Sequence, residues 1–97
     1  MAEVVIAAAA EDDFAESLRW YAERSMRAAE GFQAEFQRAL ESIATNPDRF
    51  PSCDNRHRYC LLKPYPFHVI FRELSRDQCL VVAVAHTSRR PGYWSIR

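Results

Sequence analysis

Apolar residues in the first half of the chain recur every three or four positions, the spacing that places them on one side of a helix. The pattern predicts a first helix over about residues 11–25, with acids in its first turn, and a second helix from Ser25 to Asn46. Ser25 would cap the second helix, and Pro47 would end it, because proline disfavours the helical conformation in the residue before it. The two apolar stripes are Phe14, Leu18, Tyr21 and Ser25, followed by Ala29, Phe32, Phe36, Leu40 and Ile43. Together the two helices would form an antiparallel hairpin.

Shorter apolar segments predict four strands, over about residues 3–8, 56–63, 67–72 and 79–85. The third of these alternates, with Phe67, Val69 and Phe71 on one face and His68, Ile70 and Arg72 on the other. The first has the length of an ordinary edge strand. Because short turns join the last three strands, they should form an antiparallel meander, with the helical hairpin on one of its faces. The expected fold class is α+β, in a single domain over residues 1–97.

Two residues depart from the apolar stripes of the helices. Trp20 lies beside the first stripe and should sit at its border. Gly31 weakens the second helix slightly, and we interpret it as a position of close packing against a neighbouring helix.

Composition changes this picture little but limits the class of protein. A hydrophobic fraction of 48% over 97 residues is enough for one core, and no stretch approaches the roughly 20 apolar residues of a membrane helix. The acidic Glu3 near the start argues against a targeting signal, so we expect a cytoplasmic protein. The three cysteines are odd in number and scattered, which favours free thiols. The spacing of Cys53, His57 and Cys60 lacks a fourth ligand, so no metal site is expected.

The formal charge of zero conceals two opposite halves. Residues 1–48 hold ten acids and four arginines, whereas residues 49–97 hold nine bases and three acids, giving −6 and +6. Twelve of the thirteen bases are arginine, whose planar fork suits phosphate and carboxylate groups. The asymmetry indicates a basic face that binds nucleic acid or an acidic segment of another protein. The alternative is that the acidic helical pair and the basic sheet only neutralise each other.

Candidate chemistry is concentrated after the last strand. If the strand register brings His68, Arg72 and His86 to one face, the residues Arg89, Arg90, Tyr93 and Trp94 would fold over its end. Such a set would suffice for metal-free RNA cleavage, with histidine moving protons, arginine stabilising the phosphorane and an aromatic ring stacked on a base. The alternative is structural: histidines that serve packing, arginines that are plain surface charge, and aromatic rings that cover the core edge. With two glycines in the chain, phosphate-cradling loops are excluded and no cofactor is expected.

Three segments in this order resemble the RelE/ParE superfamily of bacterial toxins. They are Asn46-Pro47 leading to Phe50-Pro51, then Lys63-Pro64-Tyr65-Pro66-Phe67-His68-Val69-Ile70-Phe71-Arg72, and finally Val84-Ala85-His86-Thr87-Ser88-Arg89-Arg90-Pro91-Gly92-Tyr93-Trp94. The resemblance covers nearly the whole chain. It implies a type II toxin that a cognate antitoxin wraps and neutralises, in a hetero-oligomer of the two proteins.

The resemblance leaves the target open between two branches of the superfamily. RelE-like members cleave messenger RNA on the ribosome, and ParE-like members bind DNA gyrase without that catalytic set. Here His68 stands where RelE-like proteins tend to carry arginine, and Lys63 is the only lysine, so the ParE-like branch is favoured. The gyrase hypothesis assigns target binding to Lys63, Arg72, Arg89, Arg90, Tyr93, Trp94 and Arg97; the nuclease hypothesis uses His68, His86, Arg89, Arg90 and Tyr93. A third interpretation is an inactive remnant kept for binding. In each case an acidic antitoxin segment is expected along the helices or across the basic sheet face.

Overall fold

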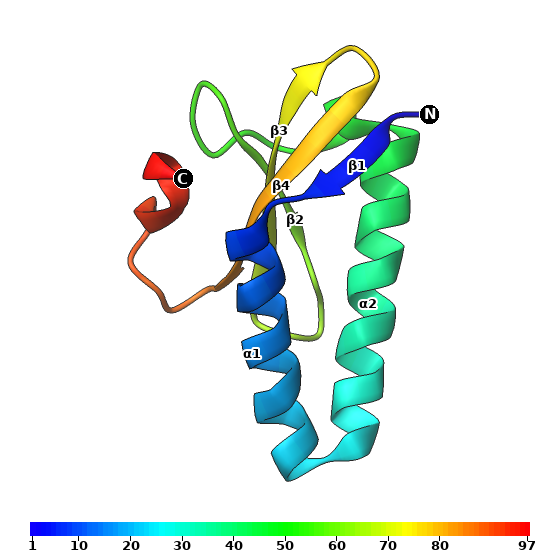
Figure 1. The fold of residues 1–97 in the computed structure, drawn as a ribbon, viewed down its shortest axis with the longest axis vertical. Coiled ribbons are helices and arrows are strands. Elements are labelled where there is room, and N and C mark those ends of the chain that lie inside the picture. The colour runs from blue at the N-terminus through cyan, green and yellow to red at the C-terminus, as the bar shows by residue number, and fades with distance from the viewer.

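Two long helices pack on one face of a mixed four-stranded sheet in this computed structural model, which describes residues 1–97 (Figure 1). The elements in chain order are β1 (Glu3–Ile6), α1 (Ala8–Arg24), α2 (Met26–Thr45), the 3-10 turn η1 (Pro47–Arg49), β2 (Arg58–Leu61), β3 (Phe67–Ser75), β4 (Gln78–His86) and the 3-10 turn η2 (Tyr93–Ile96). This arrangement confirms the predicted α+β class, with a strand, a helical hairpin and then the remaining strands.

The sheet order is β1-β4-β3-β2, so β1 and β2 form its two edges. The antiparallel meander of the last three strands is as predicted. The N-terminal strand is an edge strand, as expected, and it pairs in parallel with β4, from Glu3 opposite Gln78 to Ile6 opposite Val81. A parallel partner requires a crossover, and here the helical hairpin together with β2 and β3 supplies it.

The helical hairpin follows the predicted apolar stripes closely. Helix α1 begins at Ala8, three residues before the expected start, because the alanines that precede the acidic turn are strong helix formers. The Ser25 side chain accepts a hydrogen bond from the backbone N–H of Ala28 at 3.2 Å, which confirms it as the N-cap of α2. No helix of the chain is both long enough and apolar enough to cross a membrane.

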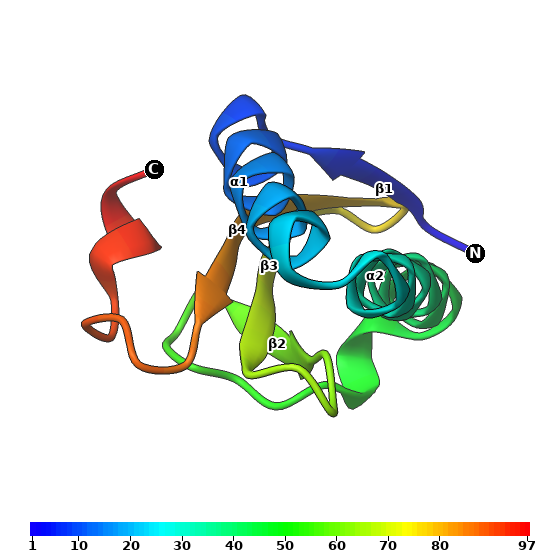
Figure 2. The same cartoon turned by 90° about the horizontal axis from the view of Figure 1, so that it is seen from below.

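Most of the core lies between the helices and the sheet. Twelve buried residues form this cluster, with Phe32, Ile43, Val69, Phe71 and Val81 among those wholly withdrawn from solvent. A second, smaller cluster lies on the other face and consists of Ile70, Val82, Ala83, Ala85 and Trp94. Figure 2 shows η2 beside β4, on the side of the sheet away from α2. The C-terminal turn therefore covers the sheet face that the helices leave open.

A β-bulge in β4 changes the face of the sheet on which the residues after it lie. Ala83 pairs with Ile70 and Val81 pairs with Phe71, so Val82 has no partner in β3. The extra residue shifts the alternation by one position. As a result Val82 faces the small cluster, whereas His86 belongs to the helix-covered face with Val84.

The turn between β2 and β3 is tied to α2 through Tyr65. Its hydroxyl donates a hydrogen bond to the carbonyl of Ala28 at 3.1 Å. A Cβ at Gly31 would overlap this hydroxyl, so the glycine leaves room for the tyrosine. Gly31 is a close-packing position as expected, but its neighbour is the β2–β3 turn and not a helix.

Candidate functional site

The segment after β4 turns back onto the sheet and ends in the η2 turn. Gly92 has a φ of 81°, in the left-handed region that glycine adopts without a steric penalty. The turn directs Trp94 into the small cluster, where 7% of the residue stays exposed. Its ring packs edge-on against His57, with centroids 5.0 Å apart. Trp94 therefore anchors the segment, and its predicted contact with a target stays a prediction.

Two arginines flank the half-buried ring of Tyr93. The guanidinium carbon of Arg89 lies 4.3 Å from the ring centroid and that of Arg97 lies 5.3 Å from it. Burial raises the pKa of Tyr93, with a further contribution from the Asp13 carboxylate. Cations stacked on a tyrosine face are fixed in direction more firmly than free side chains. We call Arg89, Arg90, Tyr93 and Arg97 the arginine ridge; Arg90 in it is exposed.

An ion pair joins the arginine ridge to helix α1. Arg97 donates to the Asp13 carboxylate at 2.7 and 3.3 Å and to the carbonyl oxygen of Val82 at 3.0 Å. The same carboxylate accepts the backbone N–H of Val84 at 3.0 Å. The hydrogen bond that Arg97 donates to Asp13 raises the pKa of Arg97. The side chains of Asp13 and Arg97 thus bond to the backbone N–H of Val84 and the carbonyl of Val82. Both groups lie in β4 beyond Val81, the last residue that pairs with β1.

His86 lies at the end of β4 on the helix-covered face. Its ring packs edge-on against Phe67, with centroids 5.0 Å apart. Nδ1 accepts the backbone N–H of Ser88 at 3.1 Å and lies 2.7 Å from the Ser88 hydroxyl. Since a backbone N–H is always a donor, Nδ1 carries no proton, and the neutral ring is protonated at Nε2. In this form His86 can donate a hydrogen bond from Nε2 but offers no free basic nitrogen.

His68 faces the opposite side of the sheet. It pairs with Ala85 of the small-cluster face, and its ring packs edge-on against Tyr59 at 5.0 Å. Burial lowers the pKa of His68, which favours the neutral imidazole at pH 7. The condition that His68, Arg72 and His86 share one face is therefore not met, because the bulge at Val82 separates the two histidines.

A groove of about 640 Å³ runs between α1 and the segment after β4; we call it the α1 groove. Its charged and aromatic lining includes Asp13, Glu16, Arg19, Trp20, Glu23, His86 and Arg89. Trp20 is 51% exposed and is covered on one face by Arg24 at 3.8 Å. The position of Trp20 beside its apolar stripe follows from the sequence, but the groove does not, because its acidic side chains come from α1 and its basic ones from the segment after β4.

The remaining predicted residues lie apart from this groove. Lys63 is exposed in the β2–β3 turn, and Arg72 lies toward the far end of β3, half-buried on the small-cluster face. The three cysteines are free. His57 is bonded through Nδ1 to the Asp54 carboxylate at 3.0 Å, and no group of three or more His, Cys, Asp or Glu side chains is placed to hold a metal ion.

Comparison with known proteins adds two findings. Residues 4–91 match the family described as "ParE toxin of type II toxin-antitoxin system, parDE". Among solved structures, the chain is similar to one from P. aeruginosa titled "Chromosomal ParDE TA system", with a TM-score of 0.67 and 18% sequence identity. The similarity covers 91% of this chain and 98% of that one. The search of curated proteins returns no match.

Proposed function

Because this chain belongs to the ParE toxin family of type II toxin-antitoxin systems, we propose that it arrests growth in the cytoplasm by binding DNA gyrase and blocking replication. The family makes it the toxin component of such a system, with a cognate antitoxin as its partner. The resemblance drawn from the sequence is thereby confirmed. Gyrase as the target is the proposal, and the shape of the C-terminal segment supports it.

The observation that carries the proposal is the way the arginine ridge is held. Trp94 fixes the segment to the sheet, and the Asp13 carboxylate fixes Arg97, while Arg89 and Arg90 stay exposed. Binding costs less entropy when contact groups are held in place before the partner arrives. A preorganised row of arginine and tyrosine has the composition of a protein-binding hot spot.

The arrangement of the histidines supports binding more than RNA cleavage. Metal-free cleavage would use a base and an acid near one phosphate. His68 and His86 lie on opposite faces of the sheet, and the Nδ1 atom of His86 is already engaged by Ser88. The two histidines therefore do not form a catalytic pair, and the proposed gyrase contact does not use them.

The antitoxin is the second proposed partner of the same region. Acidic side chains of an antitoxin segment lying along α1 would neutralise Arg89 and Arg90, and its apolar side chains would cover the exposed Trp20 at the other wall of the α1 groove. Affinity should fall as salt rises, since the exposed arginines are screened. Binding of the antitoxin that does not change with salt would contradict this arrangement.

A supercoiling assay with purified gyrase and relaxed plasmid, in the absence of ribosomes, tests the target. The wild-type toxin should inhibit supercoiling, and the double variant Arg89→Gln, Arg90→Gln should require about tenfold more protein, a loss of about 1.4 kcal/mol. The matched control Arg27→Gln, Arg76→Gln removes the same charge from exposed positions elsewhere and should behave as wild type. Unchanged supercoiling with the wild-type toxin would overturn the proposal, and discrete ribosome-dependent cuts in a message, mapped by primer extension, would establish the nuclease instead.

A further inference from the structure

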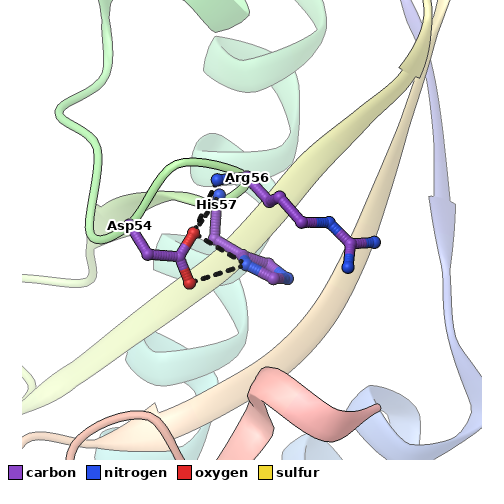
Figure 3. A network of polar contacts seen from close by, with 3 residues as sticks. All are labelled: Asp54, Arg56 and His57. Carbon is purple, nitrogen blue, oxygen red and sulfur yellow. Dashed lines mark hydrogen bonds and ion pairs between the residues drawn. The ribbon is translucent and has the colours of Figure 1, made fainter.

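The loop before β2 is closed by one carboxylate. Oδ1 of Asp54 accepts the backbone N–H groups of Arg56 and His57, both at 2.7 Å, and the two carboxylate oxygens lie 3.0 and 3.1 Å from Nδ1 of His57 (Figure 3). The backbone N–H of Arg56 is the main cause of a lowered pKa of Asp54, which keeps this carboxylate ionised. In Figure 3 the Arg56 guanidinium extends away from the carboxylate that holds its backbone.

A polar pocket of about 360 Å³ lies beside this loop, and no hydrophobic residue lines it. It brings together three arginines from different elements: Arg56 from the loop, Arg58 from β2 and Arg72 from β3. His57 also lines it and is only 3% exposed. The pocket lies at the start of β2 and the end of β3, whereas the α1 groove lies at the end of β4.

The arginines of the pocket are not equally occupied. Arg58 donates to the carbonyl oxygen of Phe50 at 2.6 Å, so its charge is partly engaged. Arg56 is exposed, and its guanidinium takes part in none of the four ion pairs of the chain. Nε of Arg72 is buried and has no hydrogen-bond partner. A buried donor without an acceptor is costly, and structures rarely leave one in place without a ligand or a water to accept it.

We propose that this pocket binds a phosphate group, with Arg56 and Arg72 as its principal donors. Guanidinium groups reach the pocket from a loop and from a strand, so they approach an anion from different directions. That distribution matches the tetrahedral oxygens of phosphate better than the flat fork of a carboxylate.

Two carboxylates, those of Asp54 and Glu73, also line the pocket and affect how tightly it can bind an anion. Asp54 is already saturated by the two backbone N–H groups and His57, so its charge is directed into the loop. Glu73 is exposed at the border, where the neighbouring carboxylate of Asp48 raises its pKa. Its negative charge opposes an anion in the pocket, so its removal should tighten binding.

An NMR titration of the isotope-labelled toxin tests the proposal with three probes: inorganic phosphate, adenosine monophosphate and a short single-stranded DNA. We expect shifts confined to the backbone amides of Arg56 and His57 and to the side-chain signals of Arg72. Saturation by the first two probes indicates a terminal phosphate as the natural group. Saturation by the DNA alone indicates a phosphodiester backbone.

Three single substitutions of arginine or glutamate separate this site from general charge attraction. Arg56→Gln should weaken binding about tenfold, as expected for loss of a charged donor, and Glu73→Gln should strengthen it severalfold. Arg27→Gln, a matched loss of charge on α2, should leave it unchanged. Equal affinity in wild type and Arg56→Gln, or the same loss in Arg27→Gln, would overturn the proposal. Arg56 and Glu73 are exposed, so these variants decide the question even if Arg72→Gln does not fold.

Discussion

The two faces of the sheet are stabilised in different ways. On one face, the two helices and the sheet enclose twelve buried residues, among which Phe32 and Phe67 pack against the partly buried rings of Phe14 and Tyr21. On the other face, five buried residues depend on a single large side chain, Trp94. The difference indicates a division of labour, in which one face stabilises the fold and the other holds the C-terminal segment in position.

The largest effect should follow from Phe32→Ala in the helix-covered core. Phe32 is wholly buried and contacts four aromatic rings, so truncation should lower the free energy of unfolding by about 3–5 kcal/mol. Urea denaturation followed by circular dichroism measures this loss. Leu74→Ala, at an apolar residue that is 43% exposed, is the control and should change it by less than about 0.5 kcal/mol. Equal losses in the two variants would refute the assignment of the core.

Trp94→Ala should have a smaller effect than Phe32→Ala, of about 2–3 kcal/mol, because its cluster is small and consists mainly of short side chains. Hydrogen exchange should become faster at the C-terminal segment and stay slow in β1 and β4. The comparison of the two faces fails if Trp94→Ala destabilises the protein as much as Phe32→Ala, or if exchange accelerates throughout the sheet.

Asp13→Asn tests whether the ion pair between helix α1 and the C-terminal segment holds that segment in position. The amide oxygen can still accept the N–H of Val84, but the charge that pairs with Arg97 is lost. The side chains are 17% and 26% exposed, so we expect a loss of about 1 kcal/mol. A double-mutant cycle with Arg97→Gln measures the coupling. A coupling energy near zero would mean that the ion pair does not hold the segment.

The smallest expected effect is that of His68→Gln on the pH dependence of stability. Burial lowers the pKa of His68 in the folded state, so below about pH 6.5 the unfolded chain binds its proton first. Wild-type stability should therefore fall as pH drops from 6.5 toward the folded-state pKa, and the variant should show a flatter profile there. Urea midpoints measured between pH 5 and 8 check this. Identical slopes of the urea midpoint against pH in wild type and His68→Gln would show that His68 is as well solvated in the folded state as in the unfolded state.

The helical hairpin was predictable from sequence because its signals are local. The apolar stripe of α2 and the cap at Ser25 lie within a few residues of the structure they determine. The same is true of Arg89 and Tyr93, which the chain brings together because they are four residues apart. The order of the meander also follows from its short turns.

The bulge and the pairing of β1 were not predictable in this way. A single unpaired residue at Val82 has no sequence signature, yet it decides the face on which His86 lies. Nothing in the short strand Glu3–Ile6 identifies β4 as its partner, because that contact spans most of the chain. The α1 groove likewise combines a helix with a segment some 70 residues away, which periodicity alone does not place together.

The close contact between Gly31 and Tyr65 restricts the order in which related sequences could have changed. Alanine at position 31 would favour the helix, but its methyl group would meet the tyrosine hydroxyl. Once phenylalanine stood at position 65, the nearest ring carbon would lie 3.4 Å from that methyl group, an ordinary contact. An alanine that strengthens α2 at position 31 is therefore compatible with this packing only if a hydroxyl group 34 residues away along the chain is lost or moves.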